Sequence, residues 1–126
     1  MGERIRVLIC DDVAMLRELI RYELEEDDDV TVVGEADNGL DGVRLVEELA
    51  PGVVVLDLAM PGIDGLEAIS LMMAVPDTPK ILVHSGFDAE TMRDRVIALG
   101  AERYLEKGGN LREVRMAVRE VMEARA

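Results

Sequence analysis

The sequence predicts an α/β fold of the flavodoxin-like, doubly wound type, with a five-stranded parallel sheet in the order 2-1-3-4-5. Two observations carry this prediction. Short runs rich in Val, Ile and Leu alternate five times with stretches of helical periodicity. The connections between them are short, which suits right-handed crossovers. The length of 126 residues and the hydrophobic content of 49% suit one core, so we expect residues 1–126 to be a single domain.

The first three predicted strands are apolar runs that end in polar turns. They cover residues 5–10, 30–36 and 53–56. The third run contains three valines and a leucine, which is typical of a strand buried on both faces. Asp57 follows it directly, so this carboxylate is predicted to emerge at the carboxyl end of a central strand.

Two shorter strands are predicted in the second half of the chain. Residues 80–84 precede Ser85, and residues 100–107 end at Lys107. His84 is the only histidine and stands beside Ser85, an arrangement that suggests a nucleophile and its base. Neighbouring side chains of a strand point to opposite faces, so we expect no such pair.

Five helices are predicted to follow the strands, over residues 13–26, 40–49, 66–73, 88–99 and 111–123. Asp12 and Asn110 precede the first and the last of them and are expected to act as N-caps. The apolar side of the first helix is predicted to consist of Leu16, Leu19, Ile20 and Leu24. The inward side of the last helix is predicted to consist of Leu111, Val114, Val118 and Val121.

The composition narrows the classes of function. The net charge of −13 disfavours binding to phosphate backbones, so no nucleic-acid partner is expected for this chain alone. No apolar stretch approaches the ~20 residues that span a bilayer, and no signal peptide is visible, which predicts a soluble, cytoplasmic protein with no membrane partner. Cys10 is expected to be a buried, inert thiol. The acidic run over residues 25–29 is expected to be a solvated loop rather than a metal site.

Polar side chains follow several of the predicted strands, and the carboxyl ends of parallel strands share one edge of a sheet. The edge is predicted to gather Asp11, Asp12, Asp57, Ser85 and Lys107. Three neighbouring carboxylates repel one another, so either they hold protons more tightly or a cation settles among them. Oxygen ligands at an open edge suit Mg²⁺. Lys107 can pair with Asp57 or with a phosphoryl oxygen, and such a set supports attack by a carboxylate on a phosphoryl group.

The chain resembles the receiver domain of two-component response regulators over essentially its whole length. The resemblance rests on Asp11-Asp12, the segment 54–65, Ser85 and the segment 104–107. It implies that Asp57 is the phosphoacceptor. It further implies that Mg²⁺ is bound by Asp12 directly, by Asp11 through water, by Asp57 and by the backbone carbonyl of Ala59.

The resemblance also assigns roles to the other residues of this edge. Ser85 and Lys107 would hold the phosphoryl group, and Tyr104 would be a switch aromatic that turns inward as Ser85 moves. The phosphoryl group would come from a histidine kinase or a phosphotransfer protein. The helix over residues 88–99, the fifth strand and the last helix would form a partner or homodimer surface. The protein would accept the group itself and lose it slowly, so it is not expected to be a turnover enzyme.

Two positions depart from the usual family pattern. Gly108 replaces a proline that follows the lysine in a cis bond, and a cis bond to another residue costs about 3 kcal/mol. We therefore expect a trans bond or a remodelled loop, with Lys107 held less firmly. Gly86 replaces an alanine and is expected to open the path to Asp57. Ala59 offers no side chain that orients or shields water, so the lifetime of the phosphate is left open.

Several alternatives remain at this stage. Tyr104 is either the switch aromatic or a packing residue with its hydroxyl in water. Arg112, Arg115 and Arg119 share one helix face, which is either a partner surface or a solvated face with pairs inside the helix, such as one to Glu120. A phosphohydrolase with an aspartate nucleophile is a rival function, but Ala59 stands where its second carboxylate would be. The other rival is a receiver-like module that docks partners without phosphorylation.

Overall fold

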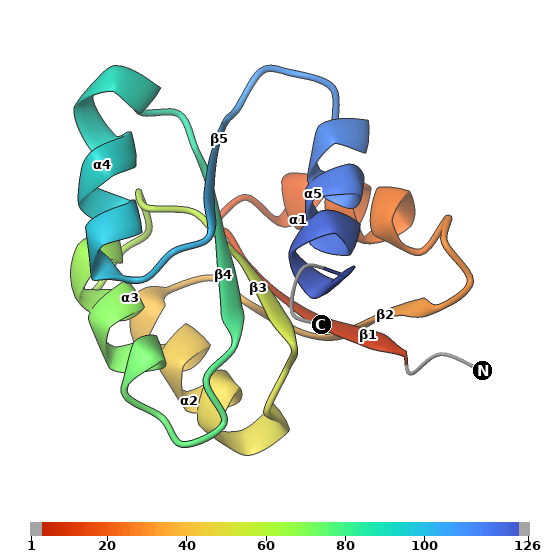
Figure 1. The fold of residues 1–126 in the computed structure, drawn as a ribbon, viewed down its shortest axis with the longest axis horizontal. Coiled ribbons are helices and arrows are strands. Elements are labelled where there is room, and N and C mark those ends of the chain that lie inside the picture. The colour runs from red at the N-terminus through yellow and green to blue at the C-terminus, as the bar shows by residue number, and fades with distance from the viewer. Residues whose placement is uncertain (1–3, 124–126) are drawn as a thin grey trace.

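The structure, a computed structural model, describes residues 4–123, which form one five-stranded sheet with helices on both faces (Figure 1). The strands are β1 Ile5–Cys10, β2 Val30–Ala36, β3 Val53–Leu56, β4 Lys80–Ser85 and β5 Arg103–Glu106. They are parallel and lie in the order β2-β1-β3-β4-β5, which confirms the predicted fold class. β3 is buried at every position, as its apolar run predicts.

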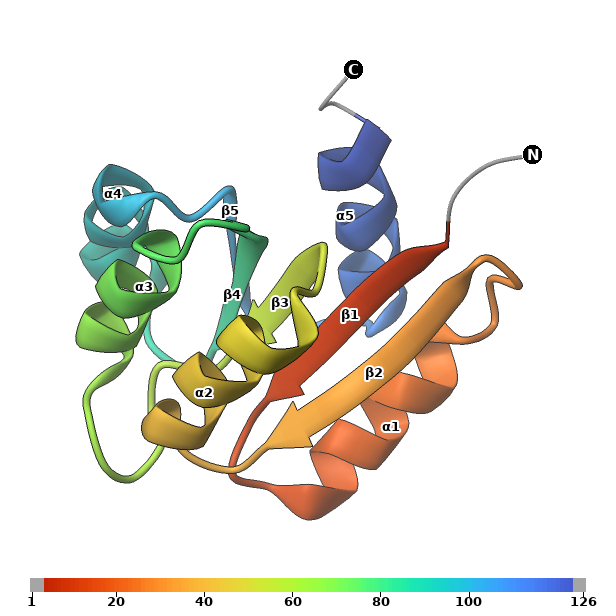
Figure 2. The same cartoon turned by 90° about the horizontal axis from the view of Figure 1, so that it is seen from below.

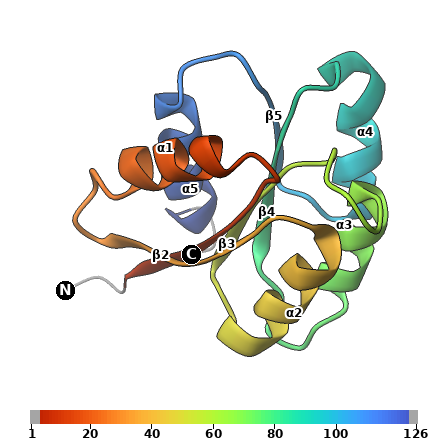
Figure 3. The same ribbon diagram turned by 180° about the vertical axis from the view of Figure 1, so that it is seen from behind.

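The helices form two layers. They are α1 Ala14–Leu24, α2 Gly39–Leu49, α3 Gly65–Met73, α4 Ala89–Leu99 and α5 Arg112–Glu123. α1 and α5 cover one face of the sheet, and α2, α3 and α4 cover the other (Figures 2 and 3). Among these helices of residues 4–123, none has both the length and the apolar character that crossing a membrane requires.

Two predicted boundaries are wrong. Asp12 does not cap the first helix: Val13 occupies the N-cap position, without a side-chain hydrogen bond. The preceding Asp11 instead accepts a hydrogen bond from the Val13 N–H at 2.9 Å. The fifth strand begins at Arg103 rather than at residue 100, because Gly100 ends α4 in the left-handed region with φ of 118°.

The core follows the predicted helix faces with one exception. Leu19 is 51% exposed, although the helical pattern placed it inward, while Ile20 and Leu24 are buried against the sheet and α5. Leu19 lies beside the buried stripe rather than in it. Cys10 is buried as predicted, and burial, together with the charge of Asp11, raises the pKa of its thiol to about 12.

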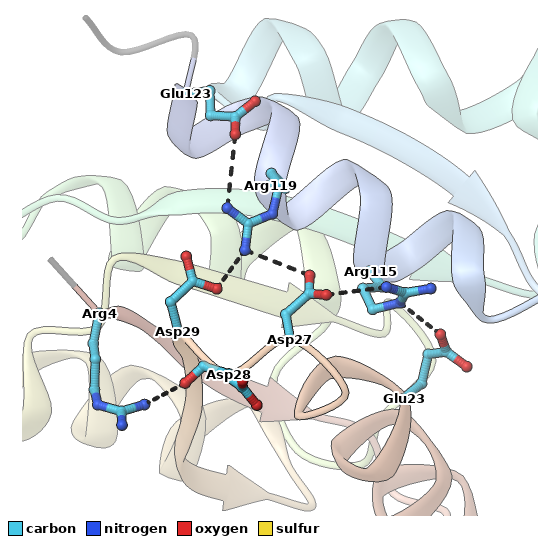
Figure 4. Close-up of polar contacts among 8 residues, drawn as sticks. All are labelled: Arg4, Glu23, Asp27, Asp28, Asp29, Arg115, Arg119 and Glu123. Atoms are coloured by element: carbon cyan, nitrogen blue, oxygen red, sulfur yellow. Dashed lines mark hydrogen bonds and ion pairs between the residues drawn. The ribbon is translucent and has the colours of Figure 1, made fainter. Parts of the chain in front are cut away.

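Two arginines of the α5 face, Arg115 and Arg119, form ion pairs with acidic residues of the same chain (Figure 4). Arg115 pairs with Glu23 at 2.7 Å and with Asp27 at 3.0 Å, and Arg119 pairs with Asp27 and Asp29. These carboxylates lie at the end of α1 and in the loop before β2, so the prediction of pairs inside the helix is wrong for Arg115, while the partner surface stays a prediction. Arg119 also makes a pair inside the helix, with Glu123 at 3.7 Å.

The acidic run over residues 25–29 is a loop in which Glu25, Glu26 and Asp28 are exposed, as predicted. Its ion pairs were not predicted: Asp27 and Asp29 are ion-paired with α5, and Glu25 accepts a hydrogen bond from the Val32 N–H at 2.9 Å. The run therefore also joins α1, β2 and α5.

Glu120, which was considered as a partner inside the helix, pairs instead with Arg103 on β5 at 3.0 Å.

His84 is buried with an exposed fraction of 5%, and its Nδ1 atom has no hydrogen-bond partner among the described residues. Ser85 is not its partner: no hydrogen bond joins the two residues within residues 4–123, and Ser85 Oγ accepts one from the Phe87 N–H at 3.1 Å. Burial and the charge of Lys107 lower the pKa of His84, although nearby carboxylates oppose this change. Burial therefore favours the neutral form of this imidazole, which lies in the core without Ser85 as a partner.

Truncation of a core residue of β4 should lower the stability of the fold. Ile81 is fully buried, so we expect Ile81→Ala to lower the free energy of unfolding by ~2–5 kcal/mol. Leu40, which is 57% exposed, is the control, and Leu40→Ala should change it by no more than ~0.5 kcal/mol. Urea denaturation followed by circular dichroism measures both values. Equal losses in the two variants would contradict the assigned core.

The stability should also depend on pH through His84. Its pKa is lowered on folding, so below the ordinary value of about 6.5 the unfolded chain binds a proton that the folded chain does not. The free energy of unfolding should therefore fall between pH 7.5 and pH 5.5, and less so in His84→Gln. Urea midpoints at both pH values measure the difference. An identical pH dependence in the variant would show that another group is responsible.

Candidate functional site

Backbone hydrogen bonds carry Asp11 and Asp57 to the same edge of the sheet. The Asp11 N–H donates to the Ala36 carbonyl at 3.0 Å, and the Asp57 N–H donates to the Cys10 carbonyl at 2.9 Å. Asp11 thus continues the pairing of β1 with β2, and Asp57 continues the pairing of β3 with β1. Both side chains are almost fully buried, with exposed fractions of 2% for Asp11 and 3% for Asp57.

Three carboxylates meet at this edge. One oxygen each from Asp11, Asp12 and Asp57 lies within 4.8 Å of the other two. Asp12 is exposed, so the cluster is open to water on one side. An all-oxygen, anionic and partly hydrated donor set fits a hard divalent cation such as Mg²⁺. The structure thus brings together the three side chains that the sequence predicted as metal ligands.

Ala59 lies two residues beyond Asp57 and is exposed. Its N–H donates to Asp57 Oδ1 at 3.1 Å, which fixes one carboxylate oxygen and turns the loop after β3 around the site. The predicted role of the Ala59 carbonyl as a metal ligand stays a prediction.

Lys107 supplies the opposite charge. Its Nζ lies 2.9 Å from Asp11 Oδ2 and 3.2 Å from Asp57 Oδ2. Burial by itself would lower the pKa of Lys107, but the hydrogen bond to Asp11 and the charge of Asp57 outweigh it, so the pKa is raised. The ammonium therefore stays charged between the two buried carboxylates.

The backbone on both sides of Lys107 shows how the residue is placed without a proline at position 108. No peptide bond among the described residues is cis, so the bond to Gly108 is trans as expected, and Gly108 has a φ of 99°. The Lys107 N–H donates to the Ser85 carbonyl at 2.7 Å, which continues the pairing of β5 with β4. Two carboxylates and this backbone bond contact Lys107, and how firmly they hold it stays a prediction.

Ser85 and Tyr104 converge on a residue that the sequence did not single out. Ser85 is fully buried, and its Oγ accepts from the Phe87 N–H, while the Tyr104 hydroxyl donates to the Phe87 carbonyl. Tyr104 is partly buried against the core, so its hydroxyl is bound to the protein rather than left in water. Phe87 has no distinctive motif, because its role is carried by its backbone alone.

Gly86 lies between Ser85 and Phe87 at the end of β4. A Cβ atom placed there would meet no other atom within 4 Å, so the position has room for the alanine that is usual in the resembled family. The glycine is therefore not required by packing. That Gly86 opens the path to Asp57 stays a prediction.

The model of the response regulator receiver domain matches residues 7–119. The chain is 41% identical to the transcriptional regulatory protein LiaR of Bacillus subtilis (strain 168) over 115 residues, which are 91% of this chain and 54% of LiaR. It is 35% identical over 113 residues to a protein-glutamate methylesterase/protein-glutamine glutaminase of Methanospirillum hungatei, which covers 88% of this chain and 33% of that protein. The chain thus spans about half or less of the length of these curated relatives.

A solved structure matches the whole described fold. It is the signal receiver domain of the response regulator NarL from Mycobacterium tuberculosis, with a TM-score of 0.90 and 30% sequence identity, and the match covers 97% of this chain and 98% of that one. The family model, the relatives and this structure agree with the resemblance inferred from the strand ends. The chain belongs to the response regulator receiver domain family.

Proposed function

We propose that this chain is a phosphorylation-activated switch in which Asp57 accepts a phosphoryl group from a phosphohistidine. A histidine kinase or a phosphotransfer protein would supply it. The observation that carries the proposal is the position of the buried Asp57 carboxylate, which lies beside Asp11, Asp12 and the ammonium of Lys107. We further propose that residues 1–126 act as one phosphoacceptor domain.

The reaction is a transfer from nitrogen to oxygen. A carboxylate oxygen of Asp57 forms a bond to phosphorus as the bond between phosphorus and the donor imidazole breaks, and the imidazole keeps the electron pair. Asp57 Oδ1 is held by the Ala59 N–H and Oδ2 by Lys107, so both oxygens have defined positions before the attack. Mg²⁺ held by Asp12, Asp57 and the Ala59 carbonyl, with Asp11 acting through water, would supply positive charge to offset that of the transferring group.

Lys107 and Ser85 are the proposed phosphoryl ligands. Lys107 already spans Asp11 and Asp57, so a short movement would carry its ammonium to an oxygen of the new phosphoryl group. Ser85 Oγ accepts a hydrogen bond from Phe87, which leaves its own O–H free to donate to the same group.

The proposed switch is the segment around Phe87. Ser85 binds its N–H and Tyr104 binds its carbonyl, so a movement of Ser85 toward the phosphoryl group would disturb both contacts. Tyr104 would then turn inward against the core that it already touches. The change would reach α4, β5 and α5, where we place the partner or homodimer surface. Because Arg115 is paired internally, that surface would not depend on it.

The remaining alternatives concern the class of protein. We propose that the chain is not a turnover enzyme, because Ala59 provides no general acid beside Asp57. The methylesterase relative is named as an enzyme, but only 33% of its length matches this chain. A cytoplasmic location and the absence of direct nucleic-acid binding stay predictions from charge and composition. Partner docking without phosphorylation stays the alternative function.

The phosphoacceptor is tested by intact mass after incubation with acetyl phosphate and Mg²⁺. We expect the wild type to gain one phosphoryl group that is lost when EDTA replaces Mg²⁺, and Asp57→Asn to gain none. Asp77→Asn, an exposed carboxylate outside the site, is the control and should be labelled like the wild type. An adduct on Asp57→Asn would contradict the assignment, and no adduct on any form would favour docking without phosphorylation.

The role of Lys107 is tested by the rate of the same reaction. We expect Lys107→Met to slow phosphorylation by about 10²-fold, which is typical for removal of one group that stabilises developing charge. The only other lysine, Lys80, lies 3.9 Å from Glu102 away from the site, and Lys80→Met should react at the wild-type rate. Equal rates for the two variants would rule out a direct role of Lys107.

A further inference from the structure

The carbonyl of Asp11 is bound by an arginine that has no part in the proposed reaction. Arg17, near the start of α1, donates from Nη1 to the Asp11 carbonyl at 2.7 Å and from Nε to Glu35 Oε1 at 2.9 Å. The side chains are 18% exposed for Arg17 and 29% exposed for Glu35. A guanidinium carries its donors in a rigid plane, so two bonds in different directions fix both its position and its orientation.

We infer that Arg17 is a positioning residue that holds the turn of Asp11 and Asp12 in the geometry needed to bind a divalent cation. The inference rests on the proposed function, because it concerns the same metal site. It assigns a role to β2 as well, since Glu35 lies on that strand and orients Arg17.

The argument depends on the peptide between Asp11 and Asp12. The Asp11 carbonyl and the Asp12 N–H belong to one planar unit, so a bond that fixes the carbonyl also fixes the direction in which the chain continues to Asp12. Asp12 is exposed, and none of the hydrogen bonds and ion pairs found within residues 4–123 involves its carboxylate. Its position therefore depends on the backbone that Arg17 holds.

Asp11 itself is held by other contacts. Its N–H donates to Ala36, its Oδ1 accepts from Val13, and its Oδ2 pairs with Lys107. Loss of Arg17 would leave these in place but free the carbonyl to rotate. The expected result is a misplaced Asp12 in a folded protein, which weakens cation binding more than it weakens the fold.

The chain offers a matched control on the same helix. Arg21 lies one turn further along α1 and pairs with the other oxygen of Glu35, Oε2, at 3.0 Å. It shares the carboxylate with Arg17 but makes no bond to the Asp11 carbonyl among the described contacts. A variant of Arg21 therefore removes a similar charge and a similar ion pair without touching the acidic turn.

The test is the dissociation constant for Mg²⁺, measured by isothermal titration calorimetry without a phosphodonor. We expect Arg17→Gln to raise it by about tenfold, the lower end of what removal of a group that orients a metal ligand costs. Arg17→Lys should raise it similarly, because an ammonium lacks the planar, fixed set of donors with which the guanidinium holds the Asp11 carbonyl and Glu35 in a defined orientation. Arg21→Gln should stay within about twofold of the wild type. Urea midpoints of all variants show whether the change follows lost stability instead.

The outcomes are distinct. Equal dissociation constants for Arg17→Gln, Arg21→Gln and the wild type would overturn the positioning role while leaving the proposed function intact. If Arg17→Gln does not fold, the positioning role is tested with Arg17→Lys and Glu35→Gln instead. Mg²⁺ affinity equal to that of the wild type in both variants would overturn this role. A wild type that binds no Mg²⁺ would overturn the proposed function and this inference together.

Discussion

The repulsion among three carboxylates at one edge of the sheet is the constraint on which the rest of this structure depends. Asp11 and Asp57 are both nearly buried, and Asp12 adds a third oxygen within 4.8 Å. Burial of like charges is costly unless an opposite charge accompanies them. The parallel fold creates this cost, because it brings the carboxyl ends of neighbouring strands together. The same crowding makes this edge a suitable place for a divalent cation.

Lys107 offsets part of that cost and links the site to the rest of the sheet. Its ammonium joins Asp11 on β1 to Asp57 after β3, and its N–H continues the pairing of β5 with β4 through Ser85. Lys107 therefore connects the carboxyl ends of four strands. On the other side of the edge, Arg17 couples the acidic turn to β2 through Glu35. Contacts from all five strands of the sheet therefore connect to the carboxylate cluster.

Much of this arrangement could be predicted from the sequence, because it follows from local patterns and strand order. Apolar runs that end in Asp11 or Asp57 are visible in a single sequence, and parallel pairing places their ends together. Partners far apart in the chain could not be predicted. Arg115 meets Glu23 across 92 residues, and a helical wheel shows only that its face is charged.

Backbone contacts form the second class of features that the sequence hides. Phe87 acts through its N–H and carbonyl, and any residue type provides these groups. The prediction that Asp12 caps α1 was wrong. The Asp11 carboxylate accepts a hydrogen bond from the Val13 N–H, and Val13 takes the N-cap position, so the Asp12 carboxylate is left for the metal site. A residue with a good capping side chain serves another role where a neighbouring charge competes for the helix end.

The most direct test of the carboxylate cluster is the urea midpoint of the wild type and of Asp12→Asn, each with and without Mg²⁺. Without the ion, relief of repulsion should leave Asp12→Asn at least as stable as the wild type. With it, the wild-type midpoint should rise, because a cation that binds only the folded state stabilises it, while the variant should respond little. A wild type that does not respond to Mg²⁺, or a variant that is less stable without the ion and responds equally to it, would contradict the account.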